Sequence, residues 1–154
     1  FNLDAHARIR LLIDEGTFKE ADEGMQSLDP LSFEGPKTYK EKIRQVFINL
    51  VDNAIKYGKQ DGEIEVGVYN TDGKNILAEI SDNGIGIAEE HLPRIFERFY
   101  RTDFGRSRNI GGTGLGLSIC KHIIEAHGHT IHARSKQDVG TTFGFTLDAK
   151  SFKD

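Results

Sequence analysis

The sequence has little of what holds a small protein together covalently or anchors it in a membrane. Its 154 residues include one cysteine, Cys120, three prolines and no tryptophan. A single cysteine excludes an internal disulfide framework and a cysteine-rich zinc module, and it is typical of a reducing compartment. No apolar run approaches the roughly 18 residues of a membrane span, and the first residues lack the pattern of a secretory signal. We therefore expect a cytoplasmic chain without direct membrane contact.

An excess of positive charge is absent as well. Lys and Arg number 20 against 24 Asp and Glu, which gives a formal net charge of −4. This balance argues against a nucleic-acid partner, because general polyanion binders present a basic surface. Glycine, in contrast, is abundant at 17 residues, so we expect tight loops that approach a ligand. The length corresponds to about one domain, and we expect residues 1–154 to form a single one.

Apolar periodicity predicts the order of the elements along the chain. Helical spacing marks residues 5–14, 41–57 and 115–127, with short helices around Pro93. Alternation typical of strands marks residues 64–68, 76–80, 130–134 and 142–147, and residues 101–114 carry neither pattern. This order predicts an α+β fold, a two-layer α/β sandwich in which helices pack on one face of a mixed, mostly antiparallel sheet.

The long helix carries a polar ridge beside its apolar stripe. Asn49, Asn53 and Lys56 lie at positions i, i+4 and i+7. One interpretation is a solvated helix face. The other is a metal and phosphate site, because an amide oxygen can ligate Mg²⁺ and a lysine one turn later adds a charge for phosphate.

A second cluster follows the predicted strand 76–80. Asp82 is followed by Asn83, Gly84, Ile85, Gly86 and Ile87. These residue types are common in a strand-ending turn. A carboxylate at a strand end, with glycines that let the backbone approach a flat ligand, also suits an amino-purine whose exocyclic amine donates to Asp82. Ile85 and Ile87 could then flank the ring.

A third cluster supplies local positive charge. Arg98, Arg101, Arg106 and Arg108 precede a glycine-rich run, residues 111–116, that leads into the predicted helix 115–127. Free backbone N–H groups and the helix dipole favour an anion at such a position. The spacing is not the dinucleotide-binding fingerprint, and no phosphate-binding loop of the G-x-x-x-x-G-K-[ST] type occurs. A nucleotide would therefore be held by another architecture.

Five motifs in this order resemble the N, G1, F, G2 and G3 boxes of the ATP-binding domain of sensor histidine kinases. They are Asn49 to Asn53, Asp82-Asn83-Gly84-Ile85-Gly86, Ile95-Phe96-Glu97-Arg98-Phe99, Gly112-Thr113-Gly114-Leu115-Gly116-Leu117 and Gly140-Thr141-Thr142-Phe143. The resemblance covers about residues 41–148. It implies the Bergerat fold, which gyrase-type, heat-shock-chaperone and mismatch-repair ATPases share, and it implies ATP and Mg²⁺ as cofactors.

The same resemblance assigns expected roles on the phosphate side. Asn53 would bind Mg²⁺, Asn49 would support the phosphates as a catalytic residue, and Lys56 would reach phosphate. Arg101 would approach the γ-phosphate as the second catalytic residue. Residues 100–114 would form a mobile lid, whose nucleotide-binding glycine box is Gly112, Thr113, Gly114, Leu115 and Gly116.

On the base side, the resemblance implies that Asp82 accepts a hydrogen bond from the adenine amine. Tyr57 would line the base pocket, Gly84 and Gly86 would shape it, and Thr142 or Thr141 would complete it. Ile85 and Ile87 belong to the same expected binding set.

The resemblance implies a domain that donates the γ-phosphoryl group to a histidine on a separate dimerisation domain, in a kinase that serves a response regulator. None of the six histidines is followed by Asp or Glu, so the phosphoacceptor segment of these kinases is missing. Because phosphoryl transfer depends on positioning and charge stabilisation, such a domain should bind nucleotide and turn it over poorly.

Residues 1–42 are atypical for these kinases. Residues 6–42, with Leu11 to Gly16 and Asp29 to Phe33, resemble a segment of the carboxyltransferase β subunit of acetyl-CoA carboxylase. The expectation is a chimera, with a grafted segment 1–42 on a kinase-like core 43–148; the alternative is a divergent natural sensor kinase in which this similarity arises by chance. The alternative function is a folded hybrid with nucleotide binding only or no activity. A homodimer through the N-terminal segment is a further expectation.

Overall fold

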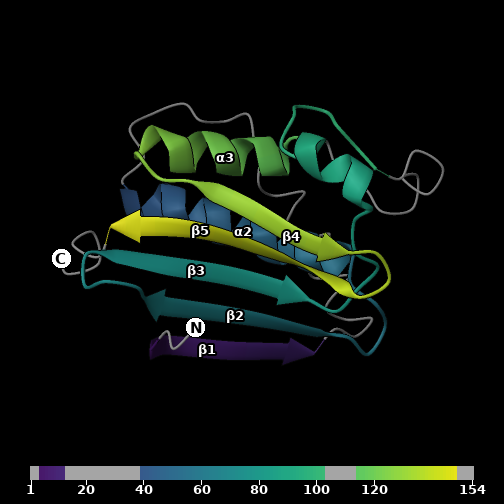
Figure 1. The fold of residues 1–154 in the computed structure, drawn as a ribbon, viewed down its shortest axis with the longest axis horizontal. Helices are drawn as coiled ribbons and strands as arrows, with labels where there is room; N and C mark the ends of the chain where they lie inside the picture. The colour runs from purple at the N-terminus through teal and green to yellow at the C-terminus, as the bar shows by residue number, and fades with distance from the viewer. Residues whose placement is uncertain (1–3, 13–38, 103–113, 149–154) are drawn as a thin grey trace.

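The computed structural model describes residues 4–12, 39–102 and 114–148, which form one sheet with two long helices against it (Figure 1). Strand β1 spans Asp4–Leu12, and helix α2 spans Tyr39–Lys56. Strands β2, Glu63–Asn70, and β3, Asn75–Asp82, form a hairpin. The short helix η1, Glu89–Arg94, then leads to helix α3, Gly116–Ala126. Strands β4, Ile131–Lys136, and β5, Gly140–Asp148, form the second hairpin.

The five described strands lie in the order β1-β2-β3-β5-β4. Each neighbouring pair is antiparallel, so no parallel pairing occurs among them. In Figure 1 helix α2 lies behind the sheet, α3 lies at the top of the view and packs on α2, β4 and β5, and the facing side of the sheet carries no helix. This arrangement confirms the α+β fold with helices on one face. No described helix is long and apolar enough to cross a membrane.

The core forms between α2, α3 and the covered face of the sheet. The apolar stripe predicted for the long helix is buried as expected, with Val46 and Leu50 fully enclosed. Phe145 of β5 meets Phe47 of α2 edge to face, with ring centroids 5.2 Å apart. Helix α3 contributes Ile124, which is fully buried. Burial of these side chains fixes the orientation of α2. Its polar ridge, Asn49, Asn53 and Lys56, then lies near Asp82, at the C-terminal end of β3.

The prediction of a helix over residues 5–14 is wrong, because Asp4–Leu12 is the strand β1. It pairs along β2 from Asp4 opposite Asn70 to Leu12 opposite Glu63, with a register shift between Ala5 and Ala7. The sequence here also alternates, with apolar residues at 5, 7, 9 and 11 and polar ones at 6, 8 and 10. Pairing with β2, far along the chain, selects the strand period over the helical one.

Candidate functional site

One cavity opens where the C-terminal half of α2 faces the end of β3. Four other segments complete it: the loop after β3, the segment after η1, the start of α3 and the start of β5. The side chains and backbone that line it are those of Asn49, Asp52, Asn53, Lys56, Tyr57, Asp82, Gly86, Ile87, Ile95, Tyr100, Arg101, Thr102, Gly114, Gly116, Leu117 and Thr141. The fold therefore brings together residues from all three polar clusters that the sequence separates.

The ridge of α2 forms one wall of this cavity. Asn49 is only 8% exposed, and its amide joins two helices. Gln45 Nε2 donates to Asn49 Oδ1 at 2.8 Å, and Asn49 Nδ2 donates to the Gly116 carbonyl at 3.4 Å. Asn53, one turn later, also lines the cavity and is half-buried. Asn49 thus fixes the start of α3 against α2 and sets the width of the cavity next to Asn53.

A carboxylate that the sequence patterns did not single out lies in the same wall. Asp52 is 7% exposed and forms an ion pair with Lys56, with 3.5 Å between Asp52 Oδ2 and Lys56 Nζ. The i, i+4 spacing of opposite charges on a helix is the signal that could have indicated it. The pair holds the Lys56 ammonium group at the cavity wall, where it can still attract phosphate.

The opposite wall contains a carboxyl group with a perturbed pKa. Asp82 ends β3, and its partial burial raises its pKa from 3.8 to about 6. The backbone N–H groups of Gly84 and Thr141 oppose this rise, and the first donates to Asp82 Oδ1 at 2.9 Å. At neutral pH the carboxylate is ionised and is an acceptor for a ligand donor.

The loop after Asp82 is clamped between α2 and the β4–β5 turn. The Ile85 N–H donates to the Tyr57 carbonyl at 3.1 Å, and the Asp138 N–H donates to the Ile85 carbonyl at 2.7 Å. A Cβ at Gly84 would collide with the Tyr57 carbonyl, and one at Gly86, where φ is +69°, would collide with Lys136. Both positions therefore require glycine for this close approach. As a result, Gly86 and Ile87 line the cavity.

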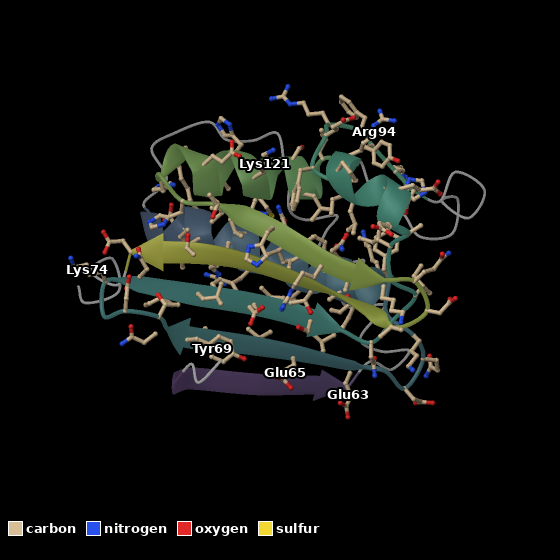
Figure 2. The ribbon with its side chains drawn as sticks, in the orientation of Figure 1. Glu63, Glu65, Tyr69, Lys74, Arg94 and Lys121 are labelled. Atoms are coloured by element: carbon tan, nitrogen blue, oxygen red, sulfur yellow. The ribbon has the colours of Figure 1, made fainter. Side chains whose placement is uncertain are left out.

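The segment after η1 carries Tyr100, Arg101 and Thr102 to the cavity. Its position is fixed by the Phe99 N–H, which donates to the Gly114 carbonyl at 2.9 Å and so joins the two described ends around residues 103–113. The Tyr100 hydroxyl is 2.5 Å from His91 Nδ1. The guanidinium carbon of Arg94, labelled in Figure 2, lies 4.5 Å from the centre of the Tyr100 ring. These contacts hold Tyr100 at the cavity wall.

Some predicted site residues lie away from this cavity. Gly84, Ile85 and Leu115 are not among the lining residues. Ile85 is 39% exposed, Leu115 is buried, and Gly84 instead lets its loop approach the Tyr57 carbonyl closely. Thr142 Oγ1 contacts Ser81 Oγ at 2.8 Å on the other face of the sheet, so Thr141 is the threonine that lines the cavity. The predicted residues that lie outside the described part of the chain are Gly112 and Thr113, with most of the expected lid.

Besides Asp52, four lining residues are not among the individually predicted site residues: Ile95, Tyr100, Thr102 and Leu117. Ile95 and Leu117 nevertheless lie within two of the five motifs, and Tyr100 and Thr102 lie within the expected lid. Tyr100 follows Phe99 within the aromatic run next to Arg101, which could have indicated it. The others are ordinary apolar or polar residues whose position depends on tertiary packing.

The cavity of this α+β sandwich is lined by a carboxylate at a strand end, an amide ridge on a helix and an arginine, which are groups that a nucleotide can use. Residues 38–151 match the family described as "Histidine kinase-, DNA gyrase B-, and HSP90-like ATPase". The chain belongs to this family.

Sensor histidine kinases are among the sequence relatives of the chain. The chain is 49% identical over 105 residues to the sensor histidine kinase YkoH of Bacillus subtilis, covering 68% of this chain and 22% of that protein. It is 48% identical over 103 residues to the sensor protein SrrB of Staphylococcus aureus, covering 67% of this chain and 18% of that protein. The chain thus spans about a fifth of the length of these relatives, and it corresponds to their ATPase catalytic domain.

Solved structures agree with this assignment. A mycobacterial sensor histidine kinase, MprB, matches with a TM-score of 0.63 and 29% identity, over 70% of this chain and 72% of that one. The catalytic domain of the histidine kinase ThkA matches with a TM-score of 0.59 and 34% identity, over 70% and 66%. These findings do not favour the chimera with a carboxyltransferase segment, and β1 pairs with β2 as an edge strand of the sheet.

Proposed function

We propose that this domain binds Mg²⁺-ATP in the cavity and donates the γ-phosphoryl group to a histidine on a separate dimerisation domain of a sensor histidine kinase. The observation that carries the proposal is the convergence of Asn53, Asp82 and Arg101 on one cavity. These residues come from three separate elements. Together they offer an amide oxygen for a cation, an acceptor for a base and a cation for phosphate.

The base would lie at the end of β3. Asp82, ionised at neutral pH, accepts a hydrogen bond from the exocyclic amine, and Tyr57 and Ile87 provide apolar surface beside the ring. A carboxylate acceptor discriminates against purines that carry a carbonyl at the same position, because two acceptors would face each other.

Mg²⁺ fits the oxygen donors of the α2 wall. Among the described residues no group of three or more His, Cys, Asp or Glu side chains could hold a metal ion alone. A cation held by the Asn53 amide oxygen, phosphate oxygens and water suits Mg²⁺, which retains several waters. When bound, Mg²⁺ neutralises charge on the phosphates, and Lys56 and Arg101 add positive charge from either side of the cavity.

The domain acts on its substrate by positioning. The walls exclude water from the base, α2 and the segment after η1 fix the phosphate chain, and the acceptor histidine comes from another domain. The partners implied are that dimerisation domain and a response regulator, both in the cytoplasm. The alternative, a folded hybrid with nucleotide binding only or no activity, is not favoured, because residues 38–151 match the ATPase family and the chain is 49% identical over 105 residues to a sensor histidine kinase.

Phosphotransfer in trans tests the proposal. The domain is incubated with γ-labelled ATP, Mg²⁺ and the histidine-bearing dimerisation domain of a sensor histidine kinase. We expect acid-labile, base-stable label on the histidine, and a loss of at least about tenfold in rate for Arg101→Ala. The matched control is Arg134→Ala, because Arg134 pairs with Glu79 at 2.8 Å on the sheet's open face and does not line the cavity. Equal rates for both variants would refute the assignment of Arg101.

A further inference from the structure

A row of residues crosses the covered face of the sheet next to the cavity. The strand registers place Asp82 opposite Thr141, and Thr141 opposite Ser135. Asp82 and Thr141 line the cavity, whereas Ser135 lies one strand further, behind Thr141. Ser135 is partly buried, and none of the motifs singled out from the sequence includes it.

The hydrogen bonds of Ser135 determine which hydroxyl group in this row is the donor and which is the acceptor. Ser135 Oγ is 2.9 Å from the Gly140 carbonyl, an acceptor only, so the single Ser135 proton is donated there. The Ile87 N–H donates to Ser135 Oγ at 2.7 Å. Ser135 Oγ and Thr141 Oγ1 are 2.8 Å apart. Because the Ser135 proton is already used, the Thr141 hydroxyl must be the donor in this contact.

This direction leaves Thr141 as a hydrogen-bond acceptor toward the cavity. Its one proton points to Ser135, so its oxygen offers lone pairs to a ligand, beside the acceptor oxygens of Asp82. The 6-amine of a purine has two protons and can donate to both oxygens, whereas a 6-carbonyl in the same place would face two acceptors.

We propose that Ser135 is a specificity-determining positioning residue, which holds the Thr141 hydroxyl as an acceptor so that the cavity selects a 6-amino purine over a 6-oxo purine. The inference rests on the proposed nucleotide site. Ser135 acts through Thr141, and through the Ile87 N–H it also joins the loop after β3 to β4.

The same sheet contains a matched control. Ser81 and Thr142 form a second hydroxyl pair, also at 2.8 Å, on the open face of the sheet and away from the cavity. Ser81→Ala therefore removes a comparable hydroxyl contact without touching the row that reaches the base. Ser135→Thr keeps a hydroxyl and is the conservative variant.

The experiment measures the dissociation constants of ADP and IDP by calorimetry with Mg²⁺, and follows their ratio. IDP differs from ADP in carrying a carbonyl in place of the 6-amine and, with it, a proton on N1. In Ser135→Ala the Thr141 hydroxyl is free to turn and donate, so we expect the preference for ADP over IDP to fall about tenfold, as for one reoriented hydrogen bond. Ser81→Ala and Ser135→Thr should keep the wild-type ratio.

A double-mutant cycle separates this role from general packing. Thr141→Val should lower the preference by itself, and adding Ser135→Ala should change it no further. A proportional loss of affinity for both nucleotides in Ser135→Ala would overturn the inference, since it would indicate a merely structural role. If Ser135→Ala fails to fold, an unchanged ratio in Thr141→Val overturns it. Wild-type protein that binds neither nucleotide would instead refute the proposed function itself.

Discussion

The ionised carboxylate of Asp82, the proposed acceptor for the ligand, should lower the free energy of unfolding at neutral pH. The substitution Asp82→Asn tests this. Burial raises the pKa of Asp82 from 3.8 to about 6. A raised acid pKa means that the folded state favours the protonated form. The resulting stability is fully present below pH 3.8 and is lost as the pH rises through about 6. At neutral pH the folded wild type therefore carries an unfavourable buried charge.

The size of this effect follows from the two pKa values. At about 1.4 kcal/mol per pH unit the shift corresponds to at most about 3 kcal/mol. Partial exposure of the carboxyl group to solvent reduces this to about 1–2 kcal/mol. The amide introduced by Asp82→Asn is not charged, and its oxygen can still accept from the Gly84 N–H, so the variant should be more stable at pH 7.5 by that amount. The melting temperature should rise by about 3–6 °C.

Urea unfolding at pH 4.0 and 7.5 measures the effect, with Asp148→Asn as the control because Asp148 ends the neighbouring strand and is exposed. The gain for Asp82→Asn should be confined to pH 7.5, and the same variant should lose at least about tenfold in affinity for ADP. Destabilisation at pH 7.5, or an equal change at both pH values, would refute the reasoning.

Two further predictions concern the loop and the core. Gly86→Ala should destabilise the domain by more than about 3 kcal/mol in urea unfolding, because Gly86 has a φ of +69° and an added Cβ would meet Lys136. The control is Gly73→Ala, at a φ of +77° with open space around it, which should lose only about 1–2 kcal/mol. An equal loss in the two variants would contradict the steric argument. Burial raises the pKa of Cys120 to about 12, so iodoacetamide at pH 8 should alkylate it only after unfolding, as mass spectrometry would show, and rapid labelling of the native protein would contradict this.

Local periodicity is enough to predict most elements. The stripe of α2 is read from spacing alone, and its apolar members are buried as that spacing requires. The prediction for β1 is wrong because Ile9, Leu12 and Ile13 fit a helical spacing, while an alternation is equally present. The partner that decides between them, β2, begins at Glu63, far along the chain.

The candidate site likewise contains residues that the sequence predicts and residues that it does not. Asp82 and Asn53 are predictable, because an acid before a glycine-rich turn and amides on a helix ridge carry chemical information in the residue type. The choice between Thr141 and Thr142 is also accessible, since Thr141 shares the parity of the buried Phe143 and Phe145. The Asp52–Lys56 pair is accessible from its i, i+4 spacing on α2, whereas the position of Ser135 behind Thr141 depends on contacts that only the folded sheet defines.

Binding of nucleotide together with Mg²⁺ through Asn53 is the central property proposed for the cavity. The most direct test is calorimetric titration with a non-hydrolysable ATP analogue, with and without Mg²⁺, on the wild type and on Asn53→Ala. We expect saturable binding that Mg²⁺ strengthens about tenfold or more in the wild type and little in the variant. Folded wild-type protein that does not bind the analogue, or binding that neither Mg²⁺ nor the substitution alters, would contradict this assignment.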